Sequence, residues 1–528
     1  MQASAKVRKR IREASYPLGP KSFEECQAWH VEKLRRLSAG PSGSLRMARC
    51  GAIIERGILA HTSFSGCDGP RYALKGTVEA YKETTSSDVN FHCVSACDLE
   101  KAQLKFLCDL SMAADAKTTC VHKDVESGID PFCKQELNRL QPKSDASVQK
   151  KRDAYAAMHT YLISNAEIAY PIDGRFDCLV HKKRCFAAPR EALRQSIEAG
   201  AASGEEWYNV PDMQTKHADS ISIHLGSTMC AGLSCLRSDA EITADAHASE
   251  RSHAVFIATR LARAKQRQED FFFHENKLRY DVKNRMEALA DTHEIITVTT
   301  DPKVEGYEVS RARRLTCGIA KHGHVYVGPE NKQMAYDDIF RSRSVLDGSV
   351  YLTASKAQLV DAYKKMAAKH GCYFEGSERD PVKIYREGGI WGLQKSRLLA
   401  WKRASKKRWF YADIGQNCRH TNTPPSHIPC LIPNSIIWSE LRGGPLLPYE
   451  HLQAQGFHVE HPPFWPEYTK VLSECTPHAM KRFAGGTVHC GVYAGFIMFI
   501  MGHVVAREKP VVQQHIITND FTDSDGEE

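Results

Sequence analysis

The sequence predicts an α/β protein in which a mostly parallel β-sheet is covered by helices on both faces and joined to a second, irregular domain. Two observations predict the sheet. Short apolar or alternating runs recur between about residues 46 and 320, and helical patterns lie between them. A third observation is the change of composition after residue 320, where Pro-rich and aromatic segments follow.

The runs at 92–97, 221–225 and 295–298 are typical of strands. Between the last two, residues 252–266 carry apolar side chains at helical spacing. The irregular region contains one clear helix, 354–370, which Thr353 or Ser355 would begin and Gly371 would end.

The expected organisation has five parts, since 528 residues exceed what one core usually organises. They are a basic extension (1–45), an α/β domain (46–320, with an insertion at about 130–215), a second domain (321–470), a return segment (471–507) and an acidic tail (508–528).

The bulk composition fits a packed protein, with 42% hydrophobic and 25% charged residues. The net charge of +8 permits a polyanionic partner without requiring one. The basic start lacks an apolar core, so no signal peptide is visible, and we expect the 18 cysteines to be mostly reduced in an intracellular, for example nuclear, protein. The apolar run 491–505 is too short to span a bilayer, which favours a buried helix and no membrane partner.

A glycine-containing turn at 61–70 connects a strand to a helix, an arrangement that lets the backbone approach a nucleotide-like ligand. Asp98, with Glu100 close behind, and Asp124 each follow a strand-like run. Acids at the ends of adjacent parallel strands point into the ligand crevice of such folds. An ordinary turn and surface acids are the alternatives for each feature alone.

Cys230 lies in the Gly/Ser/Thr-rich loop 227–234, just after the strand at 220–225. This place suits a nucleophile near backbone N–H groups that favour a thiolate. Cys235 competes with it, and a single cysteine among 18 is most often structural.

A carboxylate, Glu275, follows three consecutive aromatic residues and stands where a general acid could reach the same crevice. Further on, Arg311 and Arg313 share one face if they lie on a strand, and their guanidinium groups suit a phosphate or a base carbonyl. Solvated surface arginines are the alternative.

The order of turn, acid, acid, cysteine loop, Glu-Asn and Arg-x-Arg resembles the motif series of the cytosine carbon-5 DNA methyltransferase family, of which this chain would be a divergent member. The stretch 445–457, in which Glu450 precedes Gln455-Gly456-Phe457, is similar to a late motif of the family, and 484–489 to its closing motif. The resemblance covers about residues 55–320 and 440–505.

The resemblance implies a Rossmann-like S-adenosylmethionine-dependent methyltransferase fold, with the irregular region as target-recognition domain and 471–507 completing the catalytic domain. It implies a cofactor site made of Phe64, Gly66, Gly69, Asp98, Glu100, Asp124 and Gly485. In it, Asp98 or Glu100 would bind the ribose and Asp124 the adenine.

The family's chemistry further implies that Cys230 attacks carbon 6 of a cytosine flipped out of DNA. Glu275 would hold and protonate the ring at nitrogen 3, while Arg311 and Arg313 would steady the base carbonyl and the loop. The sequence departs from the family at Met229, Ala231, Lys277, Val309 and Gly486. An RNA substrate, or a catalytically silent nucleic-acid-binding protein, therefore stays open.

The stretch 395–411 interleaves cations with aromatic residues, which can neutralise phosphates while stacking on bases. Its candidate nucleic-acid contacts are Arg397, Trp401, Lys402, Arg403, Lys406, Lys407 and Arg408. A solvated basic helix flanked by core aromatics is an equal alternative.

Cys178, His181 and Cys185 have a spacing that could supply three zinc ligands. No fourth ligand is evident nearby in the sequence, so a structural or coincidental arrangement is favoured and no metal is predicted.

Overall fold

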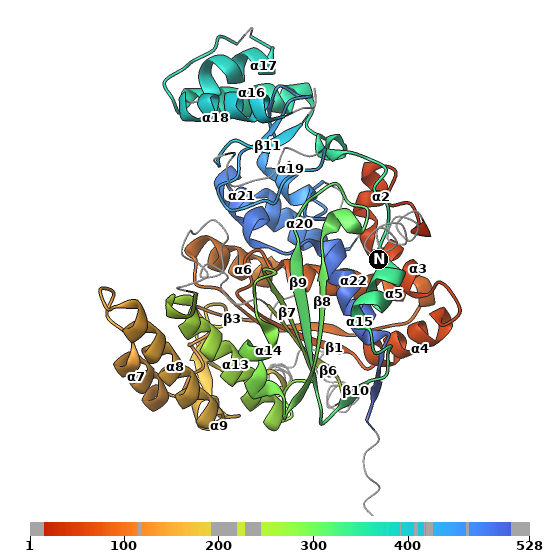
Figure 1. The fold of residues 1–528 in the computed structure, drawn as a ribbon, viewed down its shortest axis with the longest axis vertical. Coiled ribbons are helices and arrows are strands. Elements are labelled where there is room, and N and C mark those ends of the chain that lie inside the picture. The colour runs from red at the N-terminus through yellow and green to blue at the C-terminus, as the bar shows by residue number, and fades with distance from the viewer. Residues whose placement is uncertain are drawn as a thin grey trace, which may run out of the picture.

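A computed structural model describes residues 15–113, 119–191, 219–226, 244–376, 378–390, 392–405, 410–416, 418, 426–460 and 464–507. Figure 1 shows a main body built around a central sheet, with a small lobe of helices at one end and a helical insertion at the side.

The central sheet has seven strands in the order β3-β2-β1-β6-β7-β9-β8, and β9 runs antiparallel to both of its neighbours. The strands are β1 (Ile58–Ser63), β2 (Phe91–Cys97), β3 (Cys120–His122), β6 (Ile221–Gly226), β7 (Phe271–Asn276), β8 (His293–Thr300) and β9 (Arg313–Ala320). The strand order reverses beside β1, which pairs with β2 on one side and β6 on the other. Ligands bind at such a switch point in open α/β sheets. The predicted α/β sheet is confirmed.

Three consecutive phenylalanines in β7 show why its sequence reads as a continuous apolar run. Phe271 and Phe273 belong to the core cluster on one face of the sheet, and Phe272 belongs to the cluster on the other face. Successive side chains of a strand point to opposite faces, so a strand covered on both sides needs apolar residues at every position.

Helices cover both faces. The larger core packs α3 (Trp29–Leu37), α5 (Gly69–Thr85) and α22 (Cys490–Met501) against one another and the sheet. The other face carries α13 (Ser249–Lys265) and the insertion, which contains α7 (Pro131–Leu140), α8 (Val148–Ser164), α9 (Ala166–Ala169) and the hairpin β4 (Arg175–Asp177) to β5 (Arg184–Phe186). The helix predicted at 252–266 is confirmed as α13.

The remaining elements connect these layers. They are α2 (Phe23–Gln27), α4 (Gly43–Ile54), α6 (Lys101–Ala113), α14 (Val282–Arg285), α15 (Lys332–Phe340), α19 (Pro448–Gln453), α20 (Pro466–Ser473), α21 (Pro477–Gly486), β10 (His324–Tyr326) and β14 (Val504–Ala506). Single turns lie at η4 (Ala244–Ala246), η5 (Glu287–Leu289), η6 (Pro302–Val304), η7 (Gly348–Tyr351) and η8 (Tyr385–Gly389).

The apolar run near the C-terminus is a core helix. Every residue of α22 is buried. Among the described residues, the stretch Pro477–Met501 is the one helical segment long and apolar enough to cross a membrane, and 89% of its most apolar window lies inside the protein. The predicted buried helix is confirmed.

Residues 22–54 differ from the charged extension that we expect from the sequence over 1–45. They form α2, α3 and α4, and Trp29 and Leu37 are fully buried in the main core. The Trp29 indole N–H donates to the carbonyl oxygen of Gly456 at 2.7 Å, and Lys33 forms a buried ion pair with Glu305. The buried face of α3 itself contains the polar side chains His30, Lys33 and Arg36, which is why the sequence resembles a charged extension.

The small lobe has its own core. It contains α16 (Lys356–Ala368), α17 (Pro381–Ile384), α18 (Gly392–Ala404), β11 (Tyr411–Asp413), β12 (Ile437–Ser439) and β13 (Gly444–Pro445). Ser355 and Gln358 form a capping box at the start of α16, and Gly371 follows its end with a φ of 75°, in the left-handed region. The helix predicted at 354–370 is confirmed.

The lobe is smaller than the irregular region expected at 321–470. Its apolar cluster draws on residues between Ala354 and Tyr449. Before it, β10 pairs with β14, and α15 packs against β8 and α3 of the main body. After it, α19 and α20 pack against α21 and α6. Composition changes along the chain therefore do not coincide with the boundary of the packed unit.

Replacing Trp29 tests whether the N-terminal helices belong to the core. Trp29→Ala should lower the free energy of unfolding by about 3–5 kcal/mol, because a large buried side chain is lost. Trp29→Phe should cost less, since it keeps most of the packing and loses the hydrogen bond to Gly456. Urea unfolding measures both, with the exposed Val31→Ala as control. Equal stabilities for Trp29→Ala and Val31→Ala would contradict the packing.

Buried histidines predict acid sensitivity. Burial lowers the pKa of His30, His274 and His489 to about 3, and that of His324 and His458 to about 4. Because these values lie below that of an unfolded histidine, the stability they contribute is present above about pH 6.5 and is lost as the pH falls below it. Each should cost up to about 1.4 kcal/mol per pH unit. Denaturant unfolding between pH 7.5 and 5 measures how the free energy of unfolding changes with pH. His30→Gln should lower the number of protons taken up on unfolding by one, and the slope with it.

Candidate functional site

The carboxyl ends of four parallel strands meet at one edge of the sheet. Ser63 of β1 is paired with Cys97 of β2 and with Gly226 of β6, and Gly226 is paired with His274 of β7. The residues that follow are therefore neighbours in space. This register brings the turn after β1, the acid after β2 and the carboxylate at the end of β7 to the same edge.

The turn after β1 has an unusual backbone. Phe64, Gly66 and Asp68 have φ values of 53°, 56° and 62°, all in the left-handed region. The backbone N–H of Gly66 donates to Asp98 Oδ2 at 2.8 Å, so the turn and the acid after β2 hold each other. A Cβ on Gly66 would meet only the Gly486 carbonyl oxygen, at 3.9 Å. The turn thus leaves room for a ligand against its backbone.

Of the two acids predicted for the ribose, Asp98 lies at the turn. Asp98 Oδ1 also accepts hydrogen bonds from the backbone N–H groups of Leu99 and Glu100, at 2.8 and 3.1 Å. Burial raises the pKa of Asp98, while these amide hydrogen bonds act in the opposite direction. Oδ2 has one donor among the described residues and keeps a lone pair for a hydroxyl group. Glu100 is exposed and forms an ion pair with Arg482.

Asp124, predicted to contact adenine, closes a turn at the exit of β3. Its Oδ1 accepts hydrogen bonds from the backbone N–H of Glu126 at 2.8 Å and from the Ser127 hydroxyl at 3.2 Å. The side chain is half-buried. The structure places it one strand beyond Asp98, and its local hydrogen bonds orient the carboxylate.

A cavity lies between these strand ends and α13. Its wall includes Phe64 after β1, His122 and Val125 around the exit of β3, and Phe256 and Arg260 of α13. Phe64 is the one predicted cofactor residue in this wall. Helical spacing identified α13 from the sequence, but nothing in that pattern indicated that Phe256 and Arg260 line a cavity.

Glu275 and the two predicted arginines do come together. Glu275 Oε1 accepts a hydrogen bond from Arg313 Nε at 2.6 Å, and Arg311 Nη2 lies 4.0 Å from the same oxygen. Glu275 is 9% exposed and Arg311 4% exposed. The pair Glu275–Arg313 is held at the edge of the sheet, so both side chains have a fixed orientation.

Arg311 also holds the closing segment. Its guanidinium donates to the carbonyl oxygens of Leu431 at 3.0 Å, Gly485 at 3.5 Å and Thr487. Two glycines allow this close approach. A Cβ on Gly69 would lie 2.0 Å from Thr487 Oγ1, and a Cβ on Gly485 would lie 2.1 Å from the backbone of Ile432.

The predicted packing of 484–489 beside the first turn is therefore present. Gly485, however, faces Ile432 rather than the open side of the turn. Its absent side chain permits a tight backbone crossing, and the contact of Gly485 with a cofactor stays a prediction.

Glu450 of the late motif connects the lobe to the main body. This buried carboxylate accepts two hydrogen bonds from Arg442, both at 2.6 Å, and further ones from the backbone N–H groups of Leu447 and Ala354. A buried charge with this many donors is well compensated.

The candidate nucleophile follows strand β6 in the chain. Strand β6 ends at Gly226, and both Cys230 and its competitor Cys235 lie outside the described residues.

The candidate nucleic-acid contacts are only partly accessible. Trp401 is 2% exposed and packs in the core of the lobe, so it is not available for stacking on a base. The prediction that Trp401 contacts nucleic acid is therefore wrong, because its indole lies on the apolar face of α18 and packs inside the lobe. Arg397 donates to the carbonyl oxygen of Gly415 at 2.5 Å, and Lys402 pairs with Glu440. Arg403 is exposed. Lys406, Lys407 and Arg408 lie outside the described residues.

The cysteine–histidine group has a fourth member. Cys120 of β3 joins Cys178, His181 and Cys185, and the potential ligand atoms of all four lie within 4.8 Å of one another. The sequence interpretation that no fourth ligand is near is therefore wrong, because Cys120 lies 61 residues before His181.

No protein-family model and no curated relative matches the sequence. Similar solved structures include a Dnmt2 methyltransferase of S. pombe, with 9% identity, 84% of this chain and 98% of that chain covered, and a TM-score of 0.38. A second is a DNMT2 mutant of Spodoptera frugiperda, with 9% identity, 84% of this chain and 99% of that chain covered, and a TM-score of 0.32. A third is the methyltransferase EhMeth of Entamoeba histolytica, with 12% identity, 84% of this chain and 98% of that chain covered, and a TM-score of 0.34.

The strand order defines the fold class. The reversal beside β1 and the antiparallel β9 between β7 and β8 define a Rossmann-like sheet, the fold class predicted for a methyltransferase domain.

The contact between Gly69 and Thr487 can be tested by a double-mutant cycle. Gly69→Ala should lower the free energy of unfolding by about 1–3 kcal/mol, because its Cβ would overlap the Thr487 hydroxyl. Thr487→Ala in the same chain should recover part of this loss, since it removes that oxygen. Urea unfolding of the two single variants and the double variant measures the coupling. Strictly additive effects would contradict the proximity of the two segments.

Proposed function

We propose that this protein is an S-adenosylmethionine-dependent methyltransferase that modifies carbon 5 of cytosine in DNA. The observation that carries this proposal is the group at the carboxyl edge of the sheet. Glu275 is held by Arg313 at the end of β7, and β6 leads from the same edge toward Cys230. The glycine turn and Asp98 lie across the switch point from it.

The residues around the first turn fit the cofactor. Phe64 offers an aromatic surface in the cavity wall, and the open side of Gly66 admits a ligand close to its backbone. Asp98 Oδ2 would accept a hydrogen bond from a ribose hydroxyl, and Asp124 would lie toward the adenine. When bound there, S-adenosylmethionine would supply an electrophilic methyl group at the edge of the sheet.

The protein's own groups would activate the cytosine. Carbon 5 becomes nucleophilic only after a nucleophile adds to carbon 6, and the Cys230 thiolate would form that bond. The electron pair of the C5–C6 double bond then moves onto the ring, where Glu275 would hold and protonate nitrogen 3. Arg313 orients Glu275 through its hydrogen bond. After methyl transfer, a water molecule would accept the proton from carbon 5, the C5–C6 double bond would re-form as the Cys230 thiolate leaves carbon 6, and nitrogen 3 would return its proton to Glu275.

The target base would have to leave the duplex to reach this edge. The lobe of α16 to α18 is the proposed target-recognition unit. Its exposed Arg403 and the neighbouring cations Lys406, Lys407 and Arg408 would contact phosphates. The burial of Trp401 removes it from this proposed contact surface.

An oligonucleotide containing 5-fluorocytosine tests the proposal. The fluorine cannot leave as a proton does, so the covalent adduct persists after methyl transfer. With S-adenosylmethionine present, the unmodified protein should form a complex that survives denaturing electrophoresis. Cys230→Ser should abolish the complex, and the matched control Cys235→Ser should retain it.

The same experiment separates the alternatives. An adduct on an RNA oligonucleotide and not on DNA would replace the DNA substrate by RNA. Cofactor binding measured by calorimetry, together with nucleic-acid binding but no adduct on either substrate, would indicate a catalytically silent binding protein. The catalytically silent binding protein is the second candidate because Met229 and Ala231, which flank Cys230, depart from the family's motif.

A further inference from the structure

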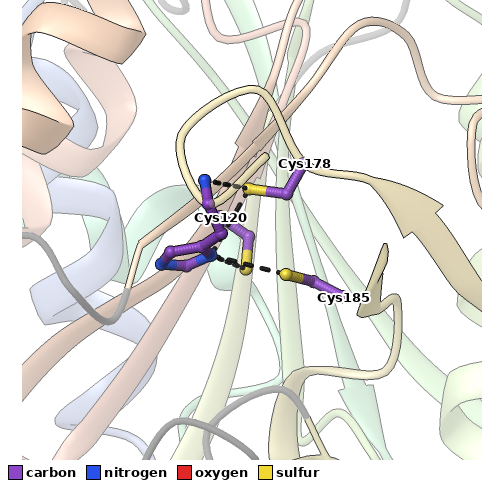
Figure 2. A group of neighbouring side chains, drawn as sticks. Cys120, Cys178 and Cys185 are labelled. Carbon is purple, nitrogen blue, oxygen red and sulfur yellow. Dashed lines mark hydrogen bonds between the residues drawn. The ribbon is translucent and has the colours of Figure 1, made fainter. Parts of the chain in front are cut away.

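Four potential metal ligands converge at the edge of the sheet where the insertion joins it. Cys120 comes from the edge strand β3, Cys178 follows β4, and Cys185 lies in β5, with His181 in the turn between the two short strands. Figure 2 shows the side chains of the three cysteines pointing toward one another from separate segments of backbone. All four ligand atoms lie within 4.8 Å of one another.

The distances match a tetrahedral site. His181 Nδ1 lies 3.4 Å from the sulfur of each cysteine, Cys120, Cys178 and Cys185. A zinc ion with Zn–S bonds of about 2.3 Å and a Zn–N bond of about 2.0–2.1 Å, at tetrahedral angles, separates nitrogen and sulfur ligands by about 3.5 Å.

Hydrogen bonding alone does not account for this arrangement. One imidazole nitrogen carries either a single proton or a single lone pair, so Nδ1 cannot form three good hydrogen bonds to three sulfur atoms at once. Three sulfur atoms at equal distances from one nitrogen are instead what a common central ion would require.

We propose that Cys120, Cys178, His181 and Cys185 form a structural zinc site. Three thiolates and one imidazole fill all four positions of a tetrahedral ion, which leaves no open position for catalysis. Soft thiolate ligands select zinc over magnesium or calcium. Three thiolates around Zn²⁺ carry one net negative charge, and Lys182, Lys183 and Arg184 follow the histidine directly in the chain.

The local backbone supports this assignment. The backbone N–H of His181 points at Cys178 Sγ at 3.4 Å, a contact that stabilises a thiolate. Lys182 adopts φ 55°, which reverses the chain between His181 and Cys185. The backbone N–H of Leu179 donates to the carbonyl oxygen of Val121 at 2.8 Å, so the hairpin is already held against β3.

The site would fasten the β4–β5 hairpin of the insertion to the edge of the sheet. Within the described part of the chain, the three-residue strand β3 pairs with β2 alone. The apolar cluster at the site consists of the three cysteines and Phe176 with two partly buried neighbours. So small a cluster contributes little hydrophobic stabilisation, whereas a structural zinc ion can stabilise a small unit by itself. Leu179 already hydrogen-bonds Val121 at this sheet edge, and the ion would hold the hairpin there.

The test is the metal content of the full-length protein. Protein purified without added metal and dialysed against a weak chelator should contain one zinc ion per chain, as measured by inductively coupled plasma mass spectrometry. Cys178→Ser and Cys185→Ser should each lose it. The matched control is Cys108→Ser, a half-buried cysteine of α6 that is not among the four ligands and should keep the ion. Absence of zinc from the unmodified protein, or full zinc content in both ligand variants, would overturn the proposal.

A second measurement on the unmodified chain does not depend on how the variants fold. Cobalt substituted for zinc should give the absorption bands of a tetrahedral thiolate site. Without reductant, the three cysteines should resist alkylation in the native protein and react once it is denatured with a strong chelator. Cysteines that stay unreactive after denaturation and become reactive only with reductant would indicate a disulfide and contradict the zinc site.

Discussion

The guanidinium of Arg311 lies buried where three distant stretches of the chain meet, and the carbonyl oxygens that its terminal nitrogens donate to compensate its charge. It hydrogen-bonds the carbonyl oxygens of Leu431 and Thr487, which follow it by 120 and 176 residues. The backbone N–H of Arg311 donates to Asp301. Arg311 thus holds together the closing segment at Thr487, the chain at Leu431 and the stretch at Asp301.

Several other features follow from that constraint. Thr487 is drawn against the first turn, which leaves no space for a side chain at Gly69. Gly485 crosses Ile432 backbone to backbone for the same reason. Two residues beyond Arg311, the side chain of Arg313 reaches Glu275. The proposed catalytic carboxylate is therefore oriented by the same stretch of chain that closes the molecule.

The lobe and the insertion are attached to the main body by different means. At the lobe, the buried Glu450 joins Arg442 to the backbone of Ala354, so hydrogen bonds fix its position. At the insertion, helices α7 to α9 pack on α13 in a shared apolar cluster, while the β4–β5 hairpin has only a small cluster and the four proposed zinc ligands hold it to β3. Since β3 runs on toward Val125 in the cavity wall, the proposed zinc site would also steady one side of the proposed cofactor pocket.

Local patterns in the sequence were sufficient for the sheet, the capped helix after Ser355, and the acids and arginines at strand ends. A strand's alternation, a helix cap and the residue after a strand depend on neighbours a few positions away. Four features needed the folded chain: the burial of Trp29, the burial of Trp401, the neighbour of Gly485 and the joining of Cys120 to the hairpin cysteines. Each depends on which distant segment packs against it, and the spacing of residues along the chain does not determine that contact.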